Sequence, residues 1–319
     1  MDRRLRAPIY GYRRSPSAFP GPSPREATDS QHPTMALGFV VLLTVLVVCS
    51  GLVGTCAICL DRTAISRTAA ELDHRFVEIS PYLAVTGVFF LAKRATHGHS
   101  LRLSRALDWD LTAEIYALEG EFVAFLQTVV PQATLEFFSA MYMFGFPYLL
   151  VTAPILYFLL PSQRHLKELL VAYLLNYLIG SLFYTLFVVY GPRNHLSSVD
   201  GLMYSFYPQT QEMTAAVSAN TNVFPSLHTS LSVVVMLLAW RSRREHPRWF
   251  PIASFVTACV VFSTMYLGIH WLIDVIAGVA LGVGSVFAAE WLVDRAEGDT
   301  GRVSVPDDRE DGIASDASD

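Results

Sequence analysis

The sequence carries little charge. Only 16% of its 319 residues are Asp, Glu, Lys or Arg, whereas soluble domains carry about 25%. A chain of this length with so few charges does not have the surface of an ordinary water-soluble enzyme, and its 52% of hydrophobic residues exclude general disorder. The formal net charge is -5 and only two residues are lysines, so we expect no nucleic-acid partner. The composition predicts an integral membrane protein whose main partner is the bilayer.

Cysteine is also scarce. The four thiols stand in or beside apolar stretches, without the spacing of a zinc site or of a disulfide scaffold. We interpret them as small packing residues. They are Cys49, Cys56, Cys59 and Cys259.

Long hydrophobic runs are abundant. A membrane-spanning helix needs about 20 apolar residues, and several stretches approach or exceed that length. They are residues 35–60, 76–92, 134–160, 166–190, 225–240, 251–268 and 269–293. The second is weakened by Glu78 and the fifth is short, so we predict an all-α polytopic membrane bundle of about six or seven spans. Residues 112–127 show helical spacing interrupted by glutamates, which predicts an amphipathic helix lying at the membrane interface.

The two ends of the chain differ from its middle. Residues 1–34 are rich in Arg, Pro and Ser, which predicts a disordered leader. Residues 35–60 would then form an extra transmembrane helix before a membrane domain at 76–293. Residues 294–319 are acidic and read as a flexible tail. An alternative is that translation begins at Met35, which would remove the leader.

The arginines favour one orientation in the membrane. Two connections between spans are basic, and basic connections stay in the cytoplasm. Their basic residues are Arg164, Lys167, Arg241, Arg243, Arg244 and Arg248. The other face, which we expect to be the outer face of the cell membrane, holds the loop at 191–224, Pro225 and the turn at 268–270. The six arginines of residues 1–34 oppose this scheme unless the leader is absent or the weak span at 76–92 does not cross.

Three polar residues at the starts of two spans suggest catalysis. His228 stands in Phe-Pro-Ser-Leu-His-Thr-Ser, and His270 is followed four residues later by Asp274. Residues four apart share a helix face, so Asp274 can orient the His270 imidazole and increase its nucleophilicity. The direction of the spans brings His228 to the same depth. One histidine can then attack, while the other protonates the leaving oxygen.

Phosphate is the ligand that the neighbouring residues suit. Pro225 fits the first turn of a helix, and the free N–H groups of that turn, with Ser226, would form an anion site. Arg193 leaves a span on the same face, where its guanidinium can bind phosphoryl oxygens.

Other uses of these residues stay open. Alone, each histidine suits a hydrogen-bonded role at the interface, Asp274 an ion pair, and Arg193 a headgroup anchor. Two histidines and an aspartate can also bind zinc or iron. The position of Asp274 after His270 suits an orienting role better than a metal ligand, so we expect no metal and no other cofactor.

The motifs resemble those of the type 2 phosphatidic acid phosphatase superfamily, in particular its inositolphosphotransferase branch, which includes inositol phosphorylceramide synthase. The resemblance covers about residues 76–293 and rests on residues 224–230, 263–267 and 270–274. It implies that His270 is the nucleophile that forms a phosphohistidine, that Asp274 orients it, and that His228 is the general acid and then base. Arg193 and Ser226 would bind phosphate, and no metal would take part.

The chain departs from the phosphatase pattern at three positions. Leu186 stands where the pattern has Lys, Leu227 where it has Gly, and Thr264 where it has Arg. The lost cations favour a monoanionic phosphodiester over a dianionic monoester. The same replacements resemble the inositolphosphotransferase branch.

Three functions are therefore open. The first is a membrane phosphotransferase that moves a phosphoryl headgroup, such as inositol phosphate, between phospholipids. The second is a lipid-phosphate or polyprenyl-pyrophosphate phosphatase. The third is a non-enzymatic transporter or assembly factor.

Overall fold

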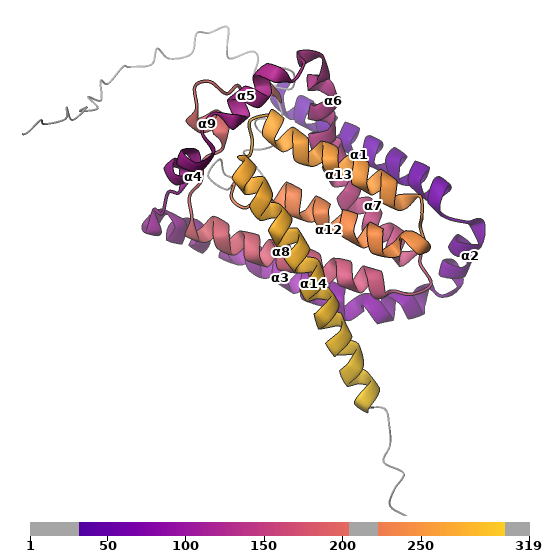
Figure 1. Ribbon diagram of the computed structural model, residues 1–319. Helices are drawn as coiled ribbons and strands as arrows, with labels where there is room; N and C mark the ends of the chain where they lie inside the picture. Colours follow the sequence, from indigo (N-terminus) through magenta and orange to yellow (C-terminus); the bar gives the residue numbers. More distant parts are fainter. Residues whose placement is uncertain (1–31, 204–222, 304–319) are drawn as a thin grey trace, which may run out of the picture.

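The computed structural model describes residues 32–203 and 223–303, and these are almost entirely helical. Figure 1 shows the helices gathered into one bundle, with the C-terminal helix extending beyond it. The helices are α1 (His32–Cys59), α2 (Arg62–Ala70), α3 (Leu72–Leu107), α4 (Thr112–Glu119), α5 (Phe122–Val129), η2 (Gln132–Thr134), α6 (Leu135–Ala140), the π-helical η3 (Met141–Gly145), α7 (Phe146–Phe158), α8 (Arg164–Leu186), α9 (Pro192–His195), α12 (Leu227–Arg241), η4 (Ser242–Arg244), α13 (Trp249–Tyr266) and α14 (Leu272–Val303).

The predicted all-α membrane bundle is confirmed. Within the described residues, six helical segments are long and apolar enough to cross a bilayer. They are Gly38–Cys59, Leu72–Thr96, Gln132–Phe158, Arg164–Leu186, Trp249–Tyr266 and Leu272–Gly298. The weak span predicted at 76–92 is one of them, because α3 extends well beyond the apolar run at both ends.

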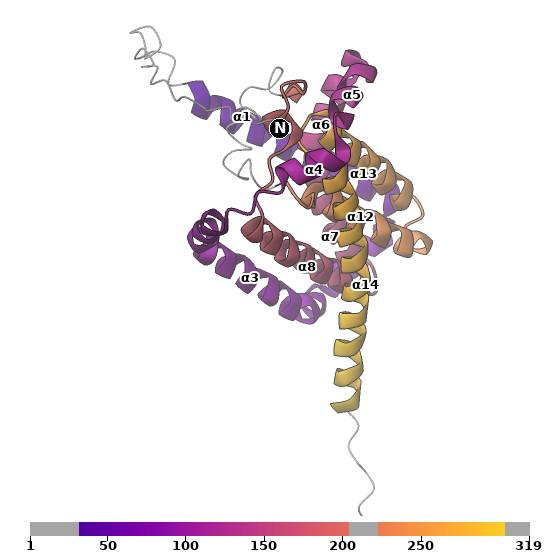
Figure 2. The same ribbon diagram turned by 60° about the vertical axis from the view of Figure 1, so that its left-hand side comes forward.

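The short helix α12 lies at the centre of the bundle. It packs against α7, α8, α13 and α14, and Figure 2 shows α3 lying outside α8 on one side. Glycines allow the closest approach: a Cβ atom on Gly278 of α14 would lie 2.6 Å from the Ser226 carbonyl oxygen, and one on Gly282 would lie 2.6 Å from that of Ser230. Small residues four apart let two membrane helices pack backbone to backbone. α14 is therefore held firmly against the start of α12.

The predicted interfacial helix at 112–127 is in fact two short helices. α4 and α5 are separated at Gly120, whose φ of 62° belongs to the left-handed region that glycine adopts without strain. The segment is anchored where the Leu111 N–H donates to the Val188 carbonyl over 3.0 Å. α4 thus lies over the end of α8 and the start of α14.

The acidic segment after residue 293 begins as helix rather than tail. α14 continues to Val303, because its acidic side chains pair with the start of α8. Asp294 lies 2.6 Å from Arg164, and Glu297 lies 2.9 Å from Lys167. Residues 304–319, like residues 1–31 of the expected leader, lie outside the described residues.

The described residues of the two faces lie as predicted, and residues 204–222 of the predicted outer loop lie outside the described residues. The two basic connections meet, since Arg164 and Arg241 both pair with Glu168. At the opposite end, the Arg193 N–H donates to the Gly268 carbonyl over 3.1 Å. We call these the arginine end and the histidine end. α1 finishes at the arginine end, where Arg248 binds the Ile58 carbonyl.

Candidate active site

His270 stands in the turn between α13 and α14, and Asp274 stands in the first turn of α14. The Nδ1 atom of His270 is 3.3 Å from Oδ2 of Asp274, and the same oxygen accepts the Trp271 N–H over 2.9 Å. Both side chains are buried. The carboxylate thus fixes the ring through Nδ1, and Nε2 is the nitrogen that it does not contact. Burial and the positive charge of Arg193 lower the pKa of His270, which keeps the imidazole neutral and nucleophilic at neutral pH.

Ser226 and His228 come from the start of α12. The Ser226 hydroxyl caps the helix by accepting the Thr229 N–H over 3.3 Å. The Ser226 N–H in turn donates to the Asp274 carbonyl over 3.1 Å. This bond joins the two helix starts directly, so the residues predicted for phosphate binding and for catalysis share one rigid junction.

The two histidine rings lie together at this junction. Their centroids are 6.0 Å apart, with the planes tilted by 60°. The ring of His228 is also packed between two aromatic side chains, Tyr142 at 4.8 Å and Phe146 at 4.4 Å between centroids. These two residues come from the π-helical turn η3 and the residue after it. The π-helical turn, a feature often found at functional sites, was not predicted from the sequence.

Arg193 reaches the site from α9, a single turn that follows α8. Its backbone binds the Gly268 carbonyl, and Gly268 has a φ of 71°. A Cβ atom on Gly268 would lie 2.8 Å from Val199 and 3.2 Å from Cβ of Arg193. Glycine is therefore required there, both by its conformation and by the close approach of α9. The structure thus gathers Arg193, Ser226, His228, His270 and Asp274 at the histidine end.

Glu119 is a residue of this region that we did not predict for the site. Its Oε2 atom accepts the Ile273 N–H over 3.1 Å, which links α4 to the first turn of α14. Its other oxygen is buried without a hydrogen-bond partner. Burial raises the pKa of the Glu119 carboxyl. From the sequence it was one of several glutamates interrupting an amphipathic pattern, and only the fold shows which glutamate reaches α14.

The three departures from the phosphatase pattern lie around the same junction. Leu227 packs against Gly180 of α8, where a Cβ atom would lie 2.6 Å from the leucine Cδ2. Thr264 is fully buried, and its carbonyl accepts the N–H groups of Ile269 and His270 over 3.0 Å each. Leu186 is the last residue of α8. None of the three contributes a positive charge.

The arrangement suits phosphoryl chemistry by two imidazoles. The His270 ring is fixed by the Asp274 carboxylate, and the centroid of the His228 ring lies 6.0 Å from that of His270. The Arg193 guanidinium and the start of α12 add positive potential that favours an anion. Among the described residues, no three His, Cys, Asp or Glu side chains are placed to bind a metal ion together.

Comparison with known proteins gives three similarities. The sequence pattern of the PAP2 superfamily, the type 2 phosphatidic acid phosphatases, matches residues 115–288, which is more than half of the chain. An uncharacterized protein of Methanocaldococcus jannaschii is 33% identical over 165 residues, which are 51% of this chain and 63% of that protein. The chain thus matches less than two thirds of that relative's length. The crystal structure of Aquifex aeolicus LpxE aligns with a TM-score of 0.44 at 20% identity, covering 54% of this chain and 94% of LpxE.

Proposed function

The chain belongs to the PAP2 superfamily, and from this premise we propose that it is a membrane phosphotransferase that moves a phosphoryl headgroup between phospholipids. The observation that carries the proposal is the pairing of His228 and His270, 6.0 Å apart, with Asp274 beside His270. A histidine at the start of α12 and a second in the turn before α14, side by side, have a simple chemical use in phosphoryl transfer. A headgroup of the inositol phosphate kind is the one that the sequence motifs favour.

The proposed reaction has two displacements. The Nε2 atom of His270 attacks the phosphorus of the donor lipid, a P–N bond forms, and the bond from phosphorus to the lipid oxygen breaks. The protonated His228 gives its proton to the leaving oxygen. The acceptor hydroxyl then gives a proton to His228, its oxygen attacks the phosphorus, and the P–N bond breaks. Asp274 keeps His270 in the required tautomer, while Arg193 and Ser226 bind the phosphoryl oxygens.

The scarcity of positive charge supports transfer from a phosphodiester. Leu186 and Thr264 occupy the positions at which the phosphatase pattern has cations. Of the cations in that pattern, this chain keeps Arg193. A phosphodiester carries one negative charge and needs less neutralisation than a phosphate monoester with two. The same site would bind monoesters less strongly, which makes a lipid-phosphate or polyprenyl-pyrophosphate phosphatase the second candidate.

The test uses the purified full chain with phosphatidylinositol labelled in the headgroup and a lipid alcohol as acceptor. We expect a new labelled phospholipid, no effect of EDTA, and no product from His270→Ala. His99→Ala is the matched control, because it removes an exposed imidazole from α3. Release of phosphate from monoesters without any transfer would favour the phosphatase. The third candidate, a non-enzymatic transporter or assembly factor, would remain if the wild-type chain neither turned over any of these lipids nor formed phosphohistidine with them.

The location of the reaction follows from the orientation proposed above. We place the histidine end at the outer face of the cell membrane, because the arginine end carries the basic connections. A membrane-impermeant reagent that modifies a cysteine introduced at the exposed Ser198 in intact cells would support this orientation. Modification only after the cells are opened would reverse it.

A further inference from the structure

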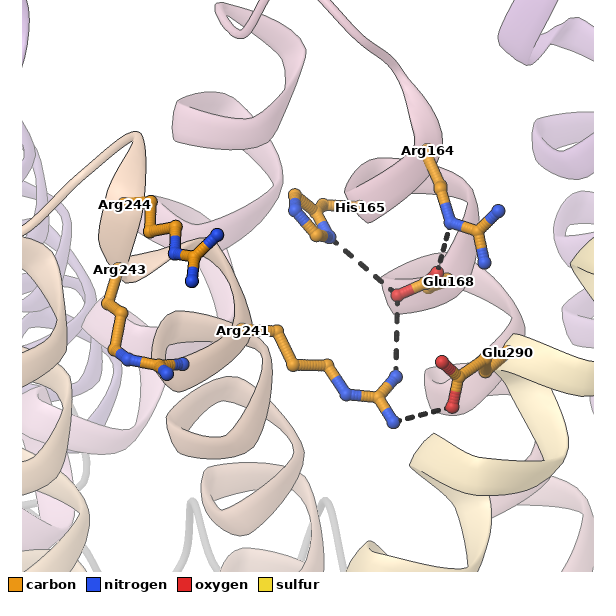
Figure 3. A pocket seen from close by; sticks show the side chains of 7 residues that line it. All are labelled: Arg164, His165, Glu168, Arg241, Arg243, Arg244 and Glu290. Carbon is orange, nitrogen blue, oxygen red and sulfur yellow. Dashed lines mark hydrogen bonds and ion pairs between the residues drawn. The ribbon is translucent and has the colours of Figure 1, made fainter.

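A polar pocket lies at the arginine end, at the far end of α12 from the histidines. α12 has 15 residues, so at about 1.5 Å per residue the two sites are roughly 20 Å apart along the helix. The pocket has a volume of about 360 Å³, and three membrane helices, α8, α12 with η4, and α14, contribute to it. Figure 3 shows the residues that line it: Arg164, His165, Glu168, Arg241, Arg243, Arg244 and Glu290.

Two of the four arginines are neutralised inside the protein. Glu168 is only 2% exposed and lies 2.9 Å from Arg164 and 3.6 Å from Arg241. Arg241 also pairs with Glu290 over 2.6 Å, and Arg164 pairs with Asp294 over 2.6 Å. A buried carboxylate needs such partners. These five side chains therefore hold α8, α12 and α14 together and leave little net charge.

The other two arginines, Arg243 and Arg244, form none of the ion pairs found among the described residues. Within the described part of the chain, no carboxylate lies within ion-pair distance of Arg243 or Arg244, and the neighbouring Glu245 reaches His165 instead. Arg243 lies over the ring of Trp240 at 3.8 Å and binds its carbonyl oxygen. Figure 3 shows both side chains extending from η4 towards the side of the pocket where His165 and Arg241 lie. The rim of the pocket thus carries two positive charges that no carboxylate of the described residues neutralises.

Apolar side chains border the same pocket. Trp240 is 48% exposed and Phe287 is 62% exposed, and the Arg241 guanidinium lies 5.7 Å from the Phe287 ring. Tryptophan is enriched where hydrocarbon meets headgroups. The surface therefore offers positive charge at headgroup depth and apolar rings beside it. An anionic phospholipid is complementary to this surface, because its phosphate is negatively charged and its acyl chains are apolar.

We propose that this pocket binds the phosphate of an anionic phospholipid in the leaflet opposite the histidine end. Basic pockets between membrane helices bind anionic headgroups, and guanidinium groups suit phosphate oxygens in particular. The acyl chains would lie along Trp240 and Phe287. Because the bound lipid would contact the ends of α8, α12 and α14 together, its binding would stabilise the folded bundle. The proposal does not depend on the reaction assigned to the histidines.

The test measures lipid binding to the delipidated full chain carrying His270→Ala, so that a lipid at the histidine end is not consumed. Fluorescent phosphatidylglycerol is titrated in nonionic detergent, and phosphatidylcholine and inorganic phosphate serve as competitors. The key variant is Arg243→Gln with Arg244→Gln, which removes the two unpaired charges and spares the ion pairs of Glu168. The matched control is Arg295→Gln, an exposed arginine of α14 that lies over Trp291 outside the pocket.

The expected result is a weaker affinity for phosphatidylglycerol in the double variant, by about fivefold for each arginine removed, with the control unchanged. Unlabelled phosphatidylglycerol should also raise the midpoint of thermal unfolding in the control and not in the double variant. Equal competition by phosphatidylcholine would overturn the proposal, and so would an unchanged affinity in the double variant. Displacement of the lipid by inorganic phosphate at equal concentration would show an anion site that does not recognise lipid, and would also overturn it.

Discussion

The two ends of α12 use polar residues in opposite ways. At the arginine end, charged side chains from three helices satisfy each other, as when Glu168 binds Arg164 and Arg241. At the histidine end, two imidazoles and a helix start lie together near the guanidinium of Arg193. Ion pairs of the first kind join helices, whereas the second arrangement places two imidazoles beside a helix start, where we propose that phosphate binds. The difference shows why the histidine end is the better candidate for chemistry, although the arginine end has more charge.

Among the variants that should keep some activity, we expect the largest effect from removing His228. His228→Ala should lower kcat by about 10² to 10⁴, the usual contribution of a general acid or base. A donor with a nitrophenolate leaving group needs no proton, so the first step should recover with that donor. Rapid mixing gives the rate of the first step with the lipid donor and with the nitrophenyl donor, and comparing the two rates checks whether His228 is the general acid. An equal loss with both donors would mean that His228 has another role.

Glycine substitutions in α14 test whether the histidine end depends on close helix packing. Gly278→Ala places a methyl group 2.6 Å from the Ser226 carbonyl, and we expect a loss of about 1–3 kcal/mol in the free energy of unfolding together with lower activity. Gly284→Ala is the matched control, since nothing lies within 4 Å of its added Cβ, and alanine there should be neutral or stabilising. Equal behaviour of the two variants would contradict the packing described for α12 and α14.

Glu119 tests the contribution of the short helix α4. Glu119→Ala removes the acceptor of the Ile273 N–H and should cost about 1 kcal/mol of stability. Glu119→Gln keeps an acceptor and avoids a buried charge, so it should retain more stability than alanine. Denaturant unfolding and kcat, measured on both variants, separate positioning from simple stability. Identical results for Gln and Ala would show that the bond to Ile273 does not matter.

The smallest expected effect comes from adding a cation to the histidine end. Leu186→Lys should raise the ratio of monoester hydrolysis to diester transfer by a few-fold, on the order of 1 kcal/mol of charge stabilisation. Leu186→Met keeps the volume without the charge and serves as the control. Competition between the two substrates in one reaction gives the ratio directly. A fall in the ratio with Lys would contradict the account of substrate charge.

The sequence was sufficient for the features that depend on local spacing. The positions of the membrane helices follow from hydrophobic runs. The pairing of His270 with Asp274 was predicted from helical spacing, but His270 lies in the turn before α14, and it is this turn that brings its ring to the carboxylate. The fifth run was predicted from residue 225, and α12 forms there as a short helix because its neighbours, rather than lipid, cover much of its surface.

The features that were missed depend on distant contacts. Glu119 meets Ile273 across 154 residues of sequence, and nothing near Glu119 indicates that contact. The acidic residues of α14 looked like a solvated tail, but pairing with Arg164 and Lys167 extends the helix to Val303. The break at Gly120 would have been visible as a glycine between two charged residues, whereas the π-helical turn η3 has no comparable signal.

The central claim is that His270 carries the phosphoryl group during the reaction. The direct measurement is to quench the wild-type chain during turnover with a headgroup-labelled donor and to map the label by mass spectrometry under alkaline conditions, which preserve phosphohistidine. The account predicts an acid-labile label on His270, absent in His270→Ala and unaffected in His99→Ala. Turnover with no label on His270, or with the label on another residue, would contradict it.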